Sequence, residues 1–163
     1  RIEPSDVIQQ QYARIGVVGV PMPFSQVYDA IKQGVVEGQE NSWSNIHNRR
    51  IQTLQKHFTE LDHSFQGYMV IASQDFWEDL PDDIRSELTE ILAEVTVEVN
   101  RIAAEQAASD RRKVAESEGV EIITPSEKDV QLWRDAMTPV WSQFEPEIGQ
   151  VVIDAAVAAG TPR

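Results

Sequence analysis

The chain has 163 residues, 41% apolar and 25% charged, enough for one ordinary domain with a hydrophobic core. Its 14 Lys and Arg residues face 27 Asp and Glu residues, and the formal charge of -13 argues against nucleic acid or an anionic membrane as the main partner. It contains no Cys, which excludes disulfides and thiolate metal sites, and no apolar run approaches the roughly 18 residues of a membrane span.

The first residues indicate the end of a strand followed by a capped helix. Residues 1–3 alternate in polarity, Pro4 breaks the strand, and Ser5 caps a helix predicted over residues 6–15. A strand whose end lies at residues 1–3 lacks its preceding residues, and the sequence shows neither an initial Met nor a signal-like segment. We therefore expect the chain to be a piece of a longer protein.

Residues 16–45 alternate between strand and helix. Short strands are predicted at 16–20 and 35–36, a helix capped by Ser25 ends before Gly34, and Asn41 caps a helix from residue 42 to about 48. An aromatic ring and a carboxylate-amide pair, Phe24 and Glu40-Asn41, fall at the two strand-to-helix junctions. Open α/β sheets bind ligands outside the carboxyl ends of their strands, so this stretch predicts a pocket.

The middle of the chain predicts two buried strands and one long helix. The strands cover 58–61 and 68–72. From Pro81 to Glu118 an apolar stripe recurs at helical spacing. Such a helix would be about 57 Å long at ~1.5 Å per residue, so it is expected to cross between two bodies.

A strand at 120–123 and amphipathic helices complete the pattern. Ser126 and Asp129 form a capping-box-like start, and Pro139 and Pro146 are expected to divide the C-terminal region into separate helices. The large aromatic and apolar residues there have helical spacing and are interpreted as core: Trp133, Met137, Val140, Trp141 and Phe144. Alternating strands and helices indicate an α/β fold.

Several motifs, in one order along essentially the whole chain, carry a family resemblance. The first motif is Arg1-Ile2, followed at a distance of 23 positions by Phe24. The others are PMPFSQVYDA from Pro21, GVVEGQEN from Gly34, and Phe76-Trp77 with Leu80-Pro81 before the long helix. The chain resembles the C-terminal half of the substrate-binding subunits of tripartite ATP-independent periplasmic (TRAP) transporters, of the DctP type. Members of that family are longer and begin with a signal peptide and a first α/β segment that this chain lacks.

The resemblance implies a periplasmic-binding-protein-like α/β fold of two lobes, with a long helix shared between them. Residues 1–66 with about 105–163 would form most of one lobe. Residues from about 67 to 104 would belong to the other lobe, whose N-terminal body is absent. Taken alone, the chain is expected to bind ligand weakly or not at all, and to self-associate through the apolar surface left exposed.

The resemblance also implies a receptor without catalytic activity or cofactor. It would bind an organic acid in the periplasm and deliver it to membrane permease subunits that use an ion gradient. The run from Glu40 to Asn45 favours a C4-dicarboxylate, with a sugar acid as the next choice. No nucleotide-binding motif is present.

The family's cleft arginine corresponds to Arg1 here. A planar guanidinium offers two parallel N–H donors to a carboxylate, worth roughly 1.5–3 kcal/mol for each charged hydrogen bond, and it stays protonated near neutrality. Without the resemblance, Arg1 would be interpreted as an ordinary solvated side chain.

Two residues near helix starts are predicted to join Arg1. Phe24 would lie against the carbon skeleton of the ligand, although it also suits a hydrophobic staple before the Ser25 cap. Ser5 would offer its hydroxyl or the helix N-terminal N–H groups to an anion.

The segment from Glu40 onward supplies the remaining candidates. Glu40 and Asn41 would present an acceptor and an amide to ligand hydroxyl or carboxylate groups, with helix capping as the alternative role. Trp43 and Asn45 are further candidates, since the first turn of a helix can point inward or outward.

Two other classes of function stay open at this stage. His47, His57 and His63 form no catalytic or metal motif, but an isomerase or lyase could use His63 as a base against an acid held by Arg1. A coiled-coil interaction module could be built on residues 84–102, although the heptad pattern is poor beyond Ile102.

Overall fold

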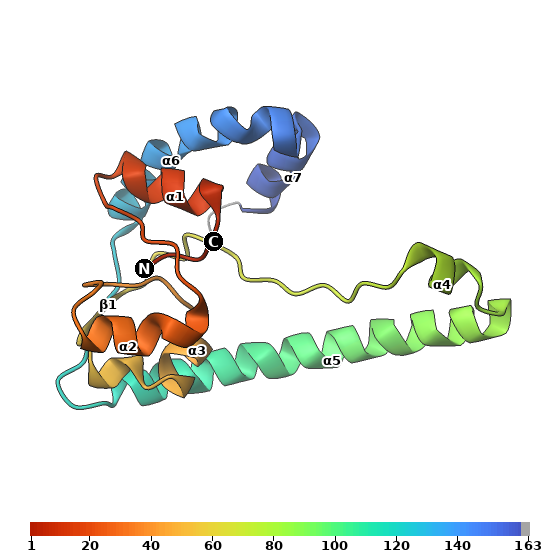
Figure 1. The fold of residues 1–163 in the computed structure, drawn as a ribbon, viewed down its shortest axis with the longest axis horizontal. Coiled ribbons are helices and arrows are strands. Elements are labelled where there is room, and N and C mark those ends of the chain that lie inside the picture. The colour runs from red at the N-terminus through yellow and green to blue at the C-terminus, as the bar shows by residue number, and fades with distance from the viewer. Residues whose placement is uncertain (161–163) are drawn as a thin grey trace. The chain divides into compact units, whose positions relative to one another are not determined.

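In the computed structural model, which describes residues 1–160, the chain divides into two compact units. The first comprises Arg1–Glu40, Leu54–Leu61 and the segment from Glu121 onward; the second comprises Asn41–Thr53 and Asp62–Val120. The fold is mixed α/β with mostly helical content, as Figure 1 shows. The α/β class is confirmed, whereas the assignment of segments to the lobes of a longer protein stays a prediction.

In the first unit, residues 1–2 run between two extended segments. Ile2 forms a parallel bridge with Pro21; its N–H donates to Val20 O (3.1 Å) and its carbonyl accepts from Met22 N–H (3.3 Å). On the other side the backbone nitrogen of Arg1 donates to Gly38 O (2.7 Å) and the N–H of Glu40 donates to Arg1 O (3.4 Å), the pattern of a parallel pair.

The predicted strands at 16–20 and 35–36 are therefore wrong in position. Pairing occurs further along, at 20–22 and 38–40. Val17 and Val18 are exposed instead, because β-branched residues make a strand only where a neighbouring backbone pairs with them.

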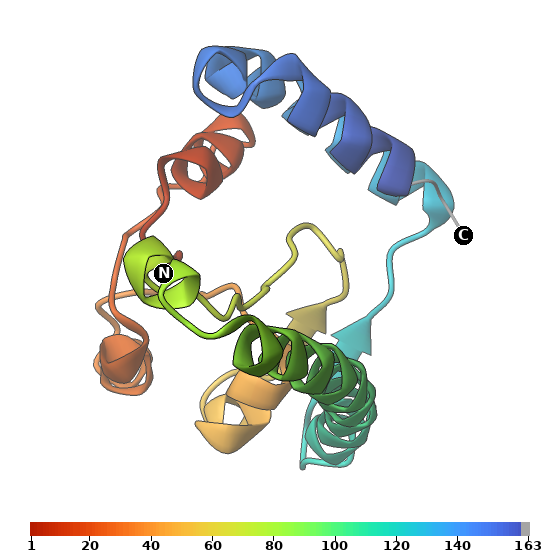
Figure 2. The same ribbon diagram turned by 90° about the vertical axis from the view of Figure 1, so that its right-hand side faces the viewer.

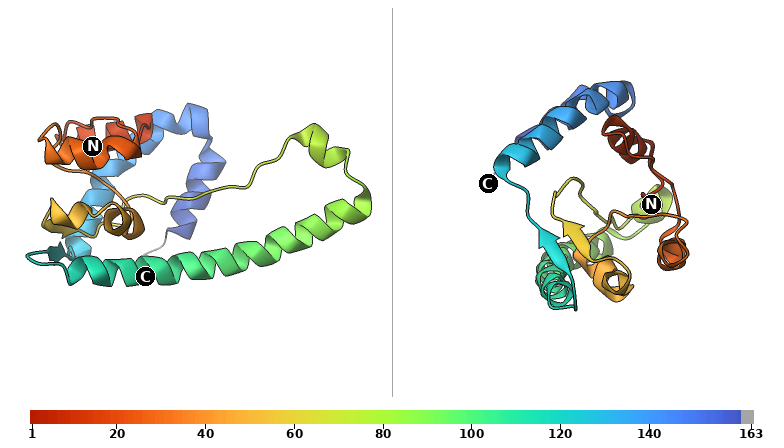
Figure 3. Two further views of the ribbon diagram at one scale, coloured as in Figure 1. Left: turned by 60° about the horizontal axis from the view of Figure 1, so that its bottom comes forward. Right: turned by 90° about the vertical axis from the view of Figure 1, so that its left-hand side faces the viewer.

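Strands β1, His57–Thr59, and β2, Glu121–Ile123, pair in parallel. The two arrows lie side by side in the right-hand view of Figure 3. Phe58 faces Ile122 in this register and is buried. The predicted strands near 58–61 and 120–123 are confirmed in shortened form. The one predicted at 68–72 is wrong, since Tyr68 to Ile71 belong to no strand and are more than four-fifths exposed.

The first helices of this unit begin at local signals. Helix α1, Asp6–Arg14, is capped by Ser5, whose Oγ accepts from the N–H of Ile8 at 3.4 Å. The short 3-10 helix η1, Phe24–Gln26, leads into α2, Val27–Lys32. The predicted cap at Ser25 is wrong, because the N-cap of η1 is Pro23, two residues earlier. Gly34, at φ 72°, follows the end of α2.

Helix α6, Glu127–Ile148, begins at the predicted cap: Ser126 Oγ accepts from the N–H of Asp129 and donates to its carboxylate. The predicted division at Pro139 and Pro146 is wrong, since both lie inside α6. The break comes at Gly149, φ 88°, before α7, Gln150–Ala159, where positive φ favours glycine. Burial of Met137 and Val140 helps offset the hydrogen bonds that the prolines remove. Figure 2 shows α1 beside α6.

The second unit contains α3, Trp43–Asn48, the short 3-10 helix η2, Ile51–Thr53, helix α4, Gln74–Glu78, and α5, Asp82–Ala115. Helix α5 runs unbroken for 34 residues, and α3 packs against it (Figures 1 and 3). The predicted long helix is confirmed. The cap of α3 is Ser42 rather than Asn41, since Ser42 Oγ accepts from the N–H of Asn45 at 3.4 Å.

Apolar side chains along the first two-thirds of α5 are exposed, whereas Val114 near its end is fully buried and Ile46 of α3 is buried as well. The exposed set, all at least 36% accessible, follows the predicted stripe: Ile84, Ile91, Leu92, Val95, Val99 and Ile102.

Candidate ligand-binding site

The guanidinium of Arg1 is almost completely buried within the first unit, with a side chain only 1% exposed. Its Nε donates to Met22 O at 3.0 Å. Its Nη1 lies 3.5 Å from Glu40 O and 3.4 Å from Glu40 Oε1, and its Nη2 donates to Glu3 Oε2. Arg1 thus sits where the paired segments 1–2, 20–22 and 38–40 give way to the helices that follow them.

Glu40 is fixed from two directions. Its Oε1 accepts from the N–H of Glu3 at 2.8 Å as well as from Arg1, and its side chain is 10% exposed. The segment that carries it is tied to the neighbouring chain segment by Gln55, whose Nε2 donates to Glu37 O at 3.1 Å. In this structure, then, the carboxylate of Glu40 bonds Arg1 and backbone, partners that the sequence did not predict.

Burial raises the pKa of the Tyr12 phenol to about 12, and the negative charge of Glu40 adds to this shift. Tyr12 therefore stays protonated at neutral pH. Its neutral phenol adds no further negative charge to the carboxylates of Glu3 and Glu40 that pair with Arg1.

Ser5 and Phe24 also belong to the first unit. The hydroxyl of Ser5 accepts from the N–H of Ile8 as the cap of α1, and its O–H can still donate to an anion. Phe24 is half-buried at the start of η1, two residues after the carbonyl that holds Arg1 Nε.

Asn41 and Trp43 lie in the second unit. Asn41 Oδ1 accepts from the N–H of Ser42 (3.1 Å) and from Asn45 Nδ2 (2.6 Å). A backbone N–H can only donate, so these contacts fix which amide atom of Asn41 is oxygen. The ring of Trp43 faces α5, with Arg111 Cζ 5.8 Å from its centroid, a cation–π distance.

A second buried charge, absent from the sequence prediction, joins α3 to α5. Asp110 is 0% exposed; it accepts from Gln106 Nε2 (2.8 Å) and Lys113 Nζ (3.0 Å), and His47 Nδ1 lies 3.2 Å away. The hydrogen bond from Gln106, opposed by burial and supported by Lys113, lowers the pKa of Asp110. Gln106 lies four residues before Asp110 and Lys113 lies three residues after it on the same helix. This spacing brings side chains together, so these contacts could have been predicted from the sequence.

Glu3 was also missed. Residues i and i+2 of an extended segment share a face, so the placement of Glu3 beside Arg1 could have been found from the alternation that predicted a strand there.

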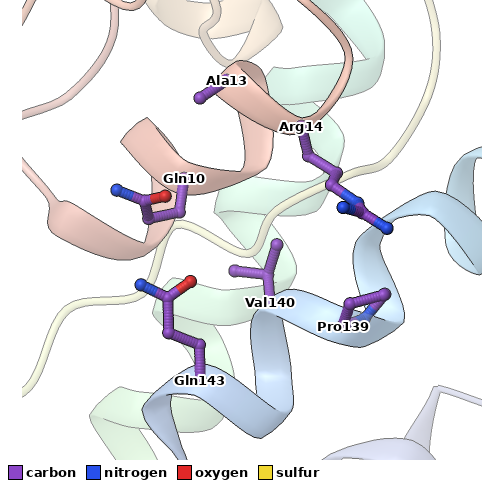
Figure 4. A pocket seen from close by; sticks show the side chains of 6 residues that line it. All are labelled: Gln10, Ala13, Arg14, Pro139, Val140 and Gln143. Atoms are coloured by element: carbon purple, nitrogen blue, oxygen red, sulfur yellow. The ribbon is translucent and has the colours of Figure 1, made fainter.

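A cavity of about 380 Å³ lies elsewhere, between α1 and α6 (Figure 4). It contains none of the predicted site residues; Gln10, Ala13 and Arg14 come from α1, and Pro139, Val140 and Gln143 come from α6. Within residues 1–160, no group of three or more His, Cys, Asp or Glu side chains is placed to hold a metal ion. No helix in this described part has the length and apolar character to cross a membrane.

The sequence profile of the DctP family, "Bacterial extracellular solute-binding protein, family 7", matches residues 1–147. A C4-dicarboxylate-binding periplasmic protein DctP of Shewanella loihica is 38% identical over 161 residues, covering 98% of this chain and 47% of the relative. The chain thus spans about half the length of the curated relatives it matches.

Solved structures of TRAP periplasmic solute-binding proteins are also similar to this chain. A TRAP periplasmic solute-binding protein of Shewanella oneidensis with bound succinate superposes with a TM-score of 0.87 at 39% identity, covering 97% of this chain and 52% of that one. One of Pseudomonas aeruginosa with bound L-malate gives a TM-score of 0.80 at 33% identity, over 88% and 50% of the two chains.

Proposed function

Because this chain belongs to the bacterial extracellular solute-binding protein family 7, the DctP family, we propose that it is part of the substrate-binding subunit of a TRAP transporter. The subunit captures an organic acid in the periplasm and delivers it to membrane permease subunits driven by an ion gradient. The observation that carries the proposal is the buried guanidinium of Arg1, held by Met22 O and Glu40 at the end of paired segments. The family consists of solute-binding proteins, so the His63 enzyme and the coiled-coil module are not taken further.

The favoured ligand is a C4-dicarboxylate, with a sugar acid next. Relatives at 33–39% identity carry succinate or L-malate. Arg1 would bind one ligand carboxylate through its Nη donors, and Phe24 would cover the carbon skeleton. Asn41, with its oxygen already bonded, would donate its NH₂ to a ligand oxygen.

The remaining predicted residues have supporting roles in this proposal. Ser5 orients the start of α1 and its N–H groups. Glu40 and Trp43 act mainly by holding Arg1 and α3, with ligand contact as the alternative from the sequence.

The test is binding by the full-length protein. A thermal-shift panel of succinate, L-malate, fumarate, hexuronates and keto acids identifies the ligand class, and calorimetry then compares wild type with Arg1→Ala. We expect Arg1→Ala to weaken binding at least about tenfold, because a desolvated carboxylate loses its charged donors. An unchanged dissociation constant would refute the role of Arg1.

We also propose that residues 1–66 with about 105–163 form most of one lobe of the full-length protein, and that residues from about 67 to 104 belong to the other. Tyr68, Met69, Val70 and Ile71 are 82–91% exposed in this chain, an apolar surface that favours association. Prepared alone, residues 1–163 are therefore expected to self-associate. Light scattering that finds a monomer at all concentrations would contradict this.

A further inference from the structure

Two carboxylates share the guanidinium of Arg1, and they differ in exposure. The side chain of Glu40 is 10% exposed, and its Oε1 also accepts the N–H of Glu3. The side chain of Glu3 is 53% exposed and pairs with Nη2. Glu40 is thus an inner partner held by backbone, and Glu3 an outer partner that faces solvent.

The other donors of Arg1 are taken by groups that cannot leave easily. Nε bonds the carbonyl of Met22 at 3.0 Å, and Nη1 faces the backbone carbonyl oxygen of Glu40 at 3.5 Å and its Oε1 at 3.4 Å. Nη2 is therefore the nitrogen whose partner can be exchanged. The side chain of Glu3 is 53% exposed, so its carboxylate can turn into water and a ligand carboxylate can take its place on the buried guanidinium.

We propose that Glu3 is an internal competitor of the ligand carboxylate for Arg1, and that Glu40 is a positioning residue that holds the guanidinium in place. The inference rests on the proposed function, since it assumes that Arg1 receives a ligand carboxylate. The two glutamates that pair with Arg1 would then have opposite effects on ligand affinity: Glu3 lowers it and Glu40 raises it.

The experiment is calorimetry on the full-length protein with succinate, and with L-malate as a second probe. Glu3→Gln keeps the shape but removes the charge that the ligand must displace, so binding is expected to tighten about threefold. Glu40→Gln leaves Arg1 with a weaker inner partner, and binding is expected to weaken about tenfold.

Glu37→Gln is the matched control for loss of one negative charge. Glu37 is exposed, three residues before Glu40, and its backbone carbonyl rather than its carboxylate makes the contact to Gln55. The affinity of this variant is expected to stay within about twofold of wild type, because solvent and salt screen an exposed carboxylate.

A double variant separates competition at Arg1 from general electrostatics. In the Arg1→Ala background, Glu3→Gln is expected to produce no tightening. Unchanged or weaker binding by Glu3→Gln, or equal tightening with and without Arg1, overturns the inference while the proposed function stands. If Arg1→Ala does not weaken binding, the proposed role of Arg1 fails together with the inference. If wild type binds neither probe, the C4-dicarboxylate assignment fails with it.

Discussion

In each of the two units a charged side chain is buried, Arg1 in the first and Asp110 in the second, with side chains 1% and 0% exposed. The partners of Arg1 come from separate segments, and one of them, Glu3, faces solvent. Asp110 takes its hydrogen bonds from its own helix, with His47 of α3 beside it. A buried charge with an exchangeable partner suits ligand binding, whereas one satisfied within a helix pair suits structure.

If that distinction is right, the largest effect on stability comes from Asp110. Asp110→Ala removes the acceptor of Gln106 and Lys113, so we expect the free energy of unfolding to fall by about 2 kcal/mol. Chemical denaturation of the full-length protein measures this. Glu98→Ala is the control, because Glu98 is paired with Arg101 on the same helix but exposed; equal losses in both variants would show that burial of Asp110 is irrelevant.

Affinity should respond to Arg1 and not to Asp110. Arg1→Lys keeps the charge but loses the planar guanidinium that bonds Met22 O and Glu40 and that we propose binds the ligand carboxylate. Succinate is therefore expected to bind about tenfold more weakly. Calorimetry should find Asp110→Asn close to wild type. A similar loss of affinity in both variants would remove the difference between the two charges.

Acid should weaken the second unit through Asp110. Its pKa in the folded state lies below the ordinary value of 3.8, so the stability that it contributes is present above pH 3.8 and is lost as the pH falls through the folded-state value. We expect the stability difference between wild type and Asp110→Asn to shrink between about pH 5 and the acid limit of folding. A difference that is constant with pH would contradict the ionised role of this carboxylate.

The smallest effect is expected at Asn45, which orients Asn41 through the 2.6 Å hydrogen bond to its Oδ1. Asn45→Ala leaves Ser42 N–H to hold that oxygen, so succinate affinity is expected to fall only about threefold. Asn48→Ala, at the exposed end of α3, is the control for helix changes. Equal affinities in the two variants would mean that Asn45 does not orient Asn41.

Sequence patterns predicted the features that are decided locally. Ser5 and Ser126 cap their helices, and the acidic start and apolar stripe of residues 82–115 give one long helix. Pairing between distant segments was less predictable: the extended pieces at 20–22 and 38–40 were placed too early, because pairing depends on which backbone lies beside them.

The candidate site shows the same limit. Arg1, Glu40 and Asn41 were predicted as ligand contacts from the resemblance, and they stay predictions. The bond between Glu40 and Arg1, 39 residues apart, was not predicted. Glu3 and Asp110 were missed because each is defined by its partners. Both Pro139 and Pro146 lie inside α6. The buried side chains of Met137 and Val140 flank Pro139, and this packing could not be predicted from the local preference of proline.

The most direct measurement is a crystal structure of the full-length protein with bound succinate. The account predicts a ligand carboxylate oxygen within about 3.2 Å of an Arg1 Nη atom, Glu3 turned away, and Glu40 still paired with Arg1. A succinate held elsewhere, with the Arg1–Glu3 pair intact, would contradict it.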